Sequence, residues 1–174
     1  LTRPDVVSDI HRRYLEAGCD IIETNTFSSQ RISMSDFGLQ DYCREINLTA
    51  VQIARQCAEE YSTPEKPRFV AGSIGPTSKT FVSEEGNDKE NFATALREAY
   101  AEQIQALVDG DVDVLLIETI FDTQNARIAF EEAKRIAPEV PVMLSFSVST
   151  PDGHNMLGQD IQEFIGTFKK GDLF

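Results

Sequence analysis

Short apolar segments alternate with longer amphipathic segments along the whole of this chain. The apolar segments are residues 20–24, 69–76, 113–118 and 140–148. Strands without a polar face are buried on both sides, and strands separated by helices pair in parallel through right-handed crossovers. The alternation therefore predicts an α/β fold built of parallel β/α units.

The first predicted helix covers residues 4–17. It begins at Pro4, which suits a first helical turn, and it ends at Gly18. Four apolar residues at helical spacing suggest the face that it buries: Val7, Ile10, Tyr14 and Leu15. The two histidines, His11 on this helix and His154 in a Pro-Asp-Gly turn, are expected on the solvated surface.

Further helices are predicted over residues 40–61, 91–109 and 122–137, and one more begins near residue 160. The helix at 91–109 has a regular apolar stripe of Phe92, Leu96, Tyr100, Ile104 and Leu107. Asp122 stands where an N-cap belongs, directly after the third strand. The order of elements is thus helix, strand, helix, strand, helix, strand, helix, strand, helix.

Two architectures fit this order: an open doubly wound sheet, or part of a (β/α)₈ TIM barrel. None of the strands is followed by the glycine motifs of nucleotide-binding open sheets. A complete barrel takes about 250 residues. If the chain is a barrel, residues 1–174 form a single partial domain that lacks the first strand and the C-terminal half.

Composition excludes several partners. Asp and Glu number 29 against 16 Lys and Arg, and the net charge of −13 disfavours nucleic acid and anionic membranes. No apolar run reaches the length of a membrane span and no signal peptide opens the chain, so a cytoplasmic protein is expected. The cysteines, Cys19, Cys43 and Cys57, lie far apart and are expected to be free thiols.

Polar residues cluster where the four predicted strands end. They are Glu23, Thr24, Asn25 and Thr26 after the first strand, Gly72, Ser73 and Gly75 in the second, Glu118 and Thr119 after the third, and Ser145 and Ser147 in the fourth. In both architectures the carboxyl ends of the strands form the ligand-binding edge. The sequence therefore predicts one shared site at this edge.

Glu118 ends the apolar strand predicted at 113–118, within the stretch LLIETIFD at residues 115–122. It either helps to cap the following helix, pairs with an Arg or Lys, or faces a cationic group of a ligand. Asp122 already offers a cap, and an unpaired buried charge costs several kcal/mol, which favours a ligand. Glu23 can equally point outward, and alternation separates Thr24 and Thr26 from Asn25 and Phe27 without fixing which pair faces inward.

Four motifs together resemble the homocysteine S-methyltransferase family, and within it the homocysteine-binding domain of cobalamin-dependent methionine synthase. They are LTRPDVV, YLEAGCDIIETNTFSS, RFVAGSIGPTSKT and DVLLIETIFDTQNA, in order along the chain. The resemblance extends from residue 1 to about residue 165 and implies an amino-terminal part of a (β/α)₈ barrel.

The resemblance also implies a function. In the family, homocysteine binds at the mouth of the barrel and its thiol accepts a methyl group, which makes methionine. The implied binding residues are Glu118, which holds the homocysteine ammonium, and Thr24, Asn25, Thr26, Phe27, Gly72, Ser73 and Ser145, which line the cleft. The full-length enzyme is expected to use zinc, methylcobalamin and methyltetrahydrofolate, the last two on separate folate and cobalamin domains of the same polypeptide.

The chain departs from the family pattern in ways that matter for activity. The three zinc cysteines are expected beyond Phe174, and none of the cysteines present matches them. This part alone is therefore expected to contain no catalytic residue, to bind no metal and to be inactive. Segment 82–92 and Leu157 also differ from the family pattern at the edge of the cleft.

Two alternatives stay open. One is a non-enzymatic α/β module that uses the Glu118 edge to bind an amino acid or a protein. The other is a different homocysteine or thiol S-methyltransferase of the same family. A different barrel enzyme that uses a lysine is disfavoured, because no predicted strand ends in one.

Overall fold

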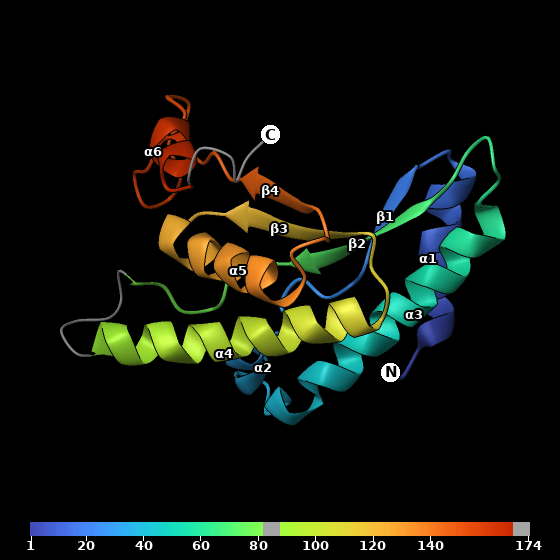
Figure 1. The fold of residues 1–174 in the computed structure, drawn as a ribbon, viewed down its shortest axis with the longest axis horizontal. Coiled ribbons are helices and arrows are strands. Elements are labelled where there is room, and N and C mark those ends of the chain that lie inside the picture. Colours follow the sequence, from blue (N-terminus) through green and yellow to red (C-terminus); the bar gives the residue numbers. More distant parts are fainter. Residues whose placement is uncertain (82–87, 169–174) are drawn as a thin grey trace.

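The computed structural model describes residues 1–81 and 88–168 (Figure 1). The strands are β1 (Ile21–Glu23), β2 (Phe69–Ile74), β3 (Val114–Ile120) and β4 (Val142–Phe146). The helices are α1 (Pro4–Glu16), α2 (Arg31–Ser35), α3 (Cys43–Tyr61), α4 (Asp88–Asp109), α5 (Thr123–Ile136) and α6 (Ile161–Gly166), and a short 3₁₀ helix, η1 (Gln40–Tyr42), leads into α3.

The four strands form one parallel sheet in which each strand lies beside the next one along the chain, in the order β1-β2-β3-β4. Right-handed crossovers that always advance in the same direction place every helix on the same face. Helices α1, α3, α4 and α5 follow one another along this face (Figure 1). A doubly wound sheet reverses direction and is covered on both faces, so the partial barrel is confirmed.

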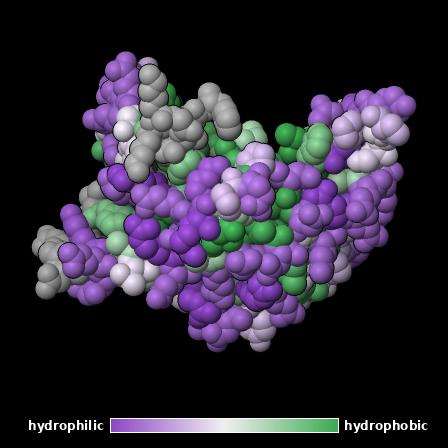
Figure 2. Space-filling model, in the orientation of Figure 1, coloured by the Kyte–Doolittle hydropathy of each residue, from purple (hydrophilic) through white to green (hydrophobic). Residues whose placement is uncertain are grey.

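The two faces of the sheet differ in cover. We call the covered side the helix face; it contributes Ile22, Val70, Ile74, Leu115, Ile117 and Ile120 to the main hydrophobic core. We call the other side the inner face; its apolar members are Ile21, Phe69, Ala71, Val114, Leu116 and Met143. Only Ala71, Val114 and Leu116 of this set form a buried cluster, and Met143 is 47% exposed. Figure 2 shows apolar surface in the hollow between the α6 and α1 ends of the molecule.

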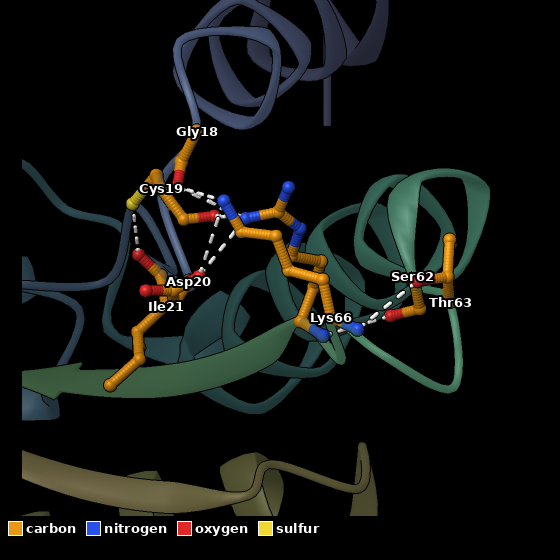
Figure 3. A network of polar contacts seen from close by, with 8 residues as sticks. Gly18, Cys19, Asp20, Ile21, Ser62, Thr63 and Lys66 are labelled. Atoms are coloured by element: carbon orange, nitrogen blue, oxygen red, sulfur yellow. Dashed lines mark hydrogen bonds and ion pairs between the residues drawn. The ribbon is translucent and has the colours of Figure 1, made fainter.

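A polar network fixes the amino-terminal end of β1 to the start of β2 (Figure 3). The Arg68 guanidinium donates to the Gly18 carbonyl at 3.1 Å and to the Asp20 carboxylate at 3.2 Å, and it also bonds the Cys19 carbonyl. Lys66 Nζ donates to the same Gly18 carbonyl at 3.1 Å. These cations lie at the amino ends of the strands, opposite to the carboxyl ends where the predicted site lies.

Helix α1 buries a different face from the one predicted. Leu15 is buried as expected, but Ile10 is 50% and Tyr14 63% exposed. The expectation for His11 was wrong, because this residue is buried rather than solvated. Apolar spacing defines two adjacent faces on this helix. The face that carries Ile10 and Tyr14 borders a groove beside β1 instead of the core.

Two other features differ from the prediction. Helix α2 follows β1 without an apolar signal in the sequence, and it forms because the Gln30 side chain caps it, accepting from Ser33 N at 2.7 Å. Helix α4 begins at Asp88 rather than residue 91, and the rest of segment 82–92 lies outside the described residues. The predicted stripe of α4 is buried, as expected.

Within the described ranges, we find no helix that combines the length and apolarity of a membrane span.

Two adjacent leucines of β3 test whether the helices cover only one face of the sheet. Leu115 lies in the closed core on the helix face, so Leu115→Ala should lower the free energy of unfolding by about 2 to 5 kcal/mol. Leu116 lies on the inner face, and its truncation leaves an open recess, so Leu116→Ala should cost only about 1 to 2 kcal/mol. Urea unfolding of both variants measures this, and equal losses would indicate helices on both faces.

Candidate functional site

Glu118 lies on the inner face, near the carboxyl end of β3, and its side chain is partly exposed. The Ser73 hydroxyl donates a short hydrogen bond of 2.6 Å to Oε1, and Thr119 Oγ1 lies 3.4 Å from Oε2. Throughout the described ranges, the hydrogen-bond donors at this carboxylate are hydroxyl groups rather than Lys or Arg. Asp122 caps α5 instead, accepting from the amides of Gln124 and Asn125. Among the described residues, Glu118 therefore neither caps α5 nor pairs with an Arg or Lys.

A backbone irregularity turns this part of β3 toward the inner face. The register with β4 shifts between Ile117 and Ile120, and Thr119 adopts φ +56°. A β-branched residue rarely occupies this left-handed region, and such strain concentrates at functional sites. Because Ile117 and Ile120 both lie in the core, the two residues between them, Glu118 and Thr119, both face away from the helices.

Glu23 places a second carboxylate on the inner face, on the adjoining part of the sheet. Loss of hydration and then the negative charge of Glu118 raise the pKa of Glu23 above its ordinary range. The two carboxylates thus share one region of negative potential. Such a region favours a ligand with a cationic group and disfavours an anionic one.

The hydroxyls of Thr24 and Thr26 lie beneath the site in a buried network. Thr24 Oγ1 and Thr26 Oγ1 are 2.7 Å apart; Ser73 N donates to the first at 3.0 Å, and the second donates to Ser73 O at 2.7 Å. Gln103 of α4 donates to the Thr26 carbonyl at 2.8 Å. Both backbone groups of Ser73 are therefore fixed by side chains, which directs its hydroxyl at Glu118.

The other residues predicted to line the cleft are dispersed. Ser145 is exposed on the inner face of β4. Phe27 is 38% exposed and packs against Gly75, whose amide donates to the Phe27 carbonyl at 2.8 Å. Asn25 borders the groove beside α1. Gly72 faces the helices, since a Cβ there would lie 3.1 Å from the Leu107 side chain. The structure thus brings Glu118, Ser73 and Ser145 to one face of the sheet. That these residues and the others named here bind a substrate stays a prediction.

Several polar residues of the helix layer support the site and escaped the sequence prediction. The Tyr100 hydroxyl bonds the Gly75 carbonyl and Asn125 Oδ1, and Asn125 Nδ2 donates to Thr77 Oγ1 at 3.0 Å. These bonds hold the loop that follows β2. Their signal was present in the sequence as polar side chains within otherwise apolar stripes, such as Gln103 near Ile104 and Leu107.

The cysteines do not form a metal centre. In the part of the chain that the structure describes, no group of three or more His, Cys, Asp or Glu side chains could hold a metal ion. Cys43 and Cys57 are buried in α3, and burial raises the pKa of Cys43 to about 11 and also raises the pKa of Cys57. A zinc site needs several ligands that converge on one point, and in the described part of the chain these cysteines do not converge with other such ligands.

A sheet of sequential β/α units, with polar groups at its carboxyl ends, defines a protein of the (β/α) barrel class. A profile of the homocysteine S-methyltransferase family matches residues 1–174, and the chain belongs to this family.

Solved structures of one protein share this fold. The homocysteine methyltransferase MmuM from Escherichia coli is similar in its metallated form, with a TM-score of 0.78, and in its oxidized form, with a TM-score of 0.77, each at 19% identity. The metallated-form comparison covers 96% of this chain and 59% of MmuM. The chain thus spans less than two thirds of the length of that protein.

The paired carboxylates make a prediction about pH. A raised pKa means that folding favours protonated Glu23; this contribution to stability is present below the unfolded pKa and is lost as the pH rises through the folded one. NMR titration should therefore give Glu23 a pKa above the ordinary value of a glutamate. Glu118→Gln should lower that pKa in part, because burial persists, whereas the exposed Glu139→Gln should leave it unchanged. A Glu23 titration indifferent to Glu118→Gln would show that the two groups do not interact.

The buried threonine pair makes a second prediction. Thr26→Val removes the donor to Ser73 O and a partner of Thr24, so it should lower the free energy of unfolding by about 1 to 3 kcal/mol. Thr94→Val, at an exposed position of α4, should change it by less than about 0.5 kcal/mol. Denaturant unfolding compares the two variants, and equal small effects would contradict the network.

Proposed function

We propose that this chain binds homocysteine on the inner face and presents its thiol for methylation, as the homocysteine-binding part of an enzyme of the cobalamin-dependent methionine synthase type. The observation that carries the proposal is the Glu118 carboxylate, which is oriented by Ser73 and, among the described residues, has hydroxyl donors rather than a Lys or Arg partner. An α-ammonium group supplies the missing positive charge and can donate more than one hydrogen bond to it.

The charges of the site also constrain the other end of the substrate. Glu118 and Glu23 repel a carboxylate, so the homocysteine carboxylate must lie away from them and accept neutral hydrogen bonds. The exposed hydroxyl of Ser145 and the backbone amides of the loop after β2 are the donors that we assign to this role. Phe27, beside Gly75, supplies an apolar wall for the methylene groups.

The methyl transfer itself breaks the bond between the donor and its methyl carbon and forms a sulfur–carbon bond, while the thiol proton leaves. A free thiol with a pKa of about 8.5 is mostly protonated at neutral pH. The described residues do not fit the zinc ion expected from the family resemblance, so we assign substrate binding and orientation to them and no step of thiol activation. Zinc, methylcobalamin, methyltetrahydrofolate and the domains that carry them are proposed to belong to polypeptide outside these residues.

A second candidate is another homocysteine S-methyltransferase of the family with a different methyl donor, because the family match over residues 1–174 does not specify the donor. Both candidates require the same ammonium site at Glu118. They differ in whether the homocysteine thiol receives its methyl group from methylcobalamin, and single-turnover assays of the complete protein with that donor separate them.

Isothermal titration calorimetry with L-homocysteine tests the ammonium site. The chain should bind homocysteine, and Glu118→Gln should weaken binding about tenfold or more, as expected for loss of a charge-assisted hydrogen bond. An analogue without the amino group, 4-mercaptobutanoic acid, should bind weakly to both proteins. Glu139→Gln, at an exposed site at the opposite end of the strands, is the matched control and should leave the affinity unchanged. Equal homocysteine affinities of the Glu118→Gln variant and the parent chain would refute the assignment.

A further inference from the structure

Gly75 is the point where the loop after β2 meets the loop after β1. A Cβ atom at Gly75 would lie 2.7 Å from the Phe27 carbonyl oxygen and 2.8 Å from two atoms of the Phe27 ring. Side-chain carbons do not approach other atoms this closely, so any larger residue at this position would displace Phe27. The Gly75 amide also donates to the Phe27 carbonyl at 2.8 Å, which joins the two loops.

Space, and not backbone conformation, accounts for this glycine. A left-handed backbone occurs at four other described glycines, namely Gly18, Gly38, Gly153 and Gly158, and Gly75 is not one of them. Alanine can therefore adopt the backbone conformation of Gly75. The substitution Gly75→Ala thus changes one property of the structure, which is the room left for Phe27.

The backbone on both sides of the Phe27 ring is fixed by hydrogen bonds. The Thr26 carbonyl accepts from Gln103 Nε2 at 2.8 Å and from the Ser29 amide at 2.9 Å. Asn47 Nδ2 of α3 donates to the Ser29 carbonyl at 2.7 Å. The side chains of Gln103 and Asn47 are both fully buried. The ring of Phe27, which is 38% exposed, is therefore presented by a backbone that is held in place.

Gly75 is held from the helix layer as well. Tyr100, which is fully buried in α4, donates from its hydroxyl to the Gly75 carbonyl at 3.1 Å. The loop after β2 is thus fixed on the side that faces away from Phe27. A Cβ atom added at Gly75 should for this reason move the partly exposed ring of Phe27 and not the loop after β2.

Strand β2 relates the Phe27 ring to the Glu118 carboxylate. The Ser73 hydroxyl donates to Glu118 at 2.6 Å, and Gly75, two residues further on, borders the ring. Side chains two residues apart on an extended strand lie on the same face, about 6.6 Å from one another. An amino acid with its ammonium group at Glu118 therefore extends a short side chain before it meets the ring.

We infer that Gly75 is a positioning residue that sets the place of the Phe27 ring, and that the ring in this place selects amino acids by the length of their side chain. The inference rests on the proposed ammonium site at Glu118 and names what distinguishes homocysteine from cysteine there. Both amino acids carry an ammonium, a carboxylate and a thiol group. Homocysteine has one methylene group more, and burial of one methylene group favours it about fourfold.

Isothermal titration calorimetry of the chain with L-homocysteine and with L-cysteine tests this selection. The parent chain should prefer homocysteine by about fourfold or more. Gly75→Ala moves the ring and Phe27→Ala removes it, so each should lower the preference to about one. Phe37→Ala removes a ring that is 77% exposed between α2 and η1, and it should leave the preference unchanged.

NMR of the Phe27 ring separates positioning from a general loss of stability. Gly75→Ala should shift the ring resonances and speed hydrogen exchange of the amide at residue 75, because its bond to the Phe27 carbonyl is disturbed. Val51→Ala truncates a fully buried side chain beside Gly110, at the far end of α4, and should lower stability without shifting these resonances. Tyr100→Phe frees the Gly75 carbonyl without adding an atom, and it should shift the same resonances even if Gly75→Ala does not fold.

Three results would overturn the inference: a parent chain that binds homocysteine and cysteine equally, a preference for homocysteine that persists in Phe27→Ala, or Phe27 ring resonances that neither Gly75→Ala nor Tyr100→Phe shifts. In each of these cases a loss of homocysteine affinity in Glu118→Gln would still support the proposed function. Absence of binding of both amino acids to the parent chain would instead overturn the proposed function and the selection together.

Discussion

Parallel pairing of the strands in chain order is the constraint on which the rest of the structure depends. Because each crossover is right-handed and advances in the same direction, the helices gather on one face and the carboxyl ends of the strands on one edge. The inner face is consequently free for a ligand, and Glu23, Ser73, Glu118 and Ser145 reach it from four different strands. The same pairing leaves β1 with an unpaired edge beneath α1.

The second determinant is the way in which polar groups are fixed beneath the site. The hydroxyls of Thr24 and Thr26 hold the backbone of Ser73 on both sides, and the Ser73 hydroxyl donates to Glu118. Gln103, in turn, holds the Thr26 carbonyl from the helix layer. Buried networks of this kind are costly when incomplete, so they favour one geometry. A carboxylate fixed in advance loses less entropy when it binds an ammonium group.

Much of this arrangement could be predicted from the sequence, because it depends on local patterns. The stripe of α4 and the cap at Asp122 follow from helical spacing and capping chemistry, and the order of elements predicts the parallel sheet. The outward turn of Thr119 could not be predicted, since it depends on the left-handed backbone that this residue adopts. Nor could the burial of Thr24 and His11, because alternation and helical spacing define faces without showing what covers them.

The central claim is that Glu118 holds the ammonium group of homocysteine on the inner face. A crystal structure of the chain with L-homocysteine bound tests it most directly. We predict the amino nitrogen within hydrogen-bond distance of Glu118, with the Ser73 hydroxyl still donating to the same carboxylate. Homocysteine bound in the groove beside α1, or with its carboxylate toward Glu118, would contradict the account.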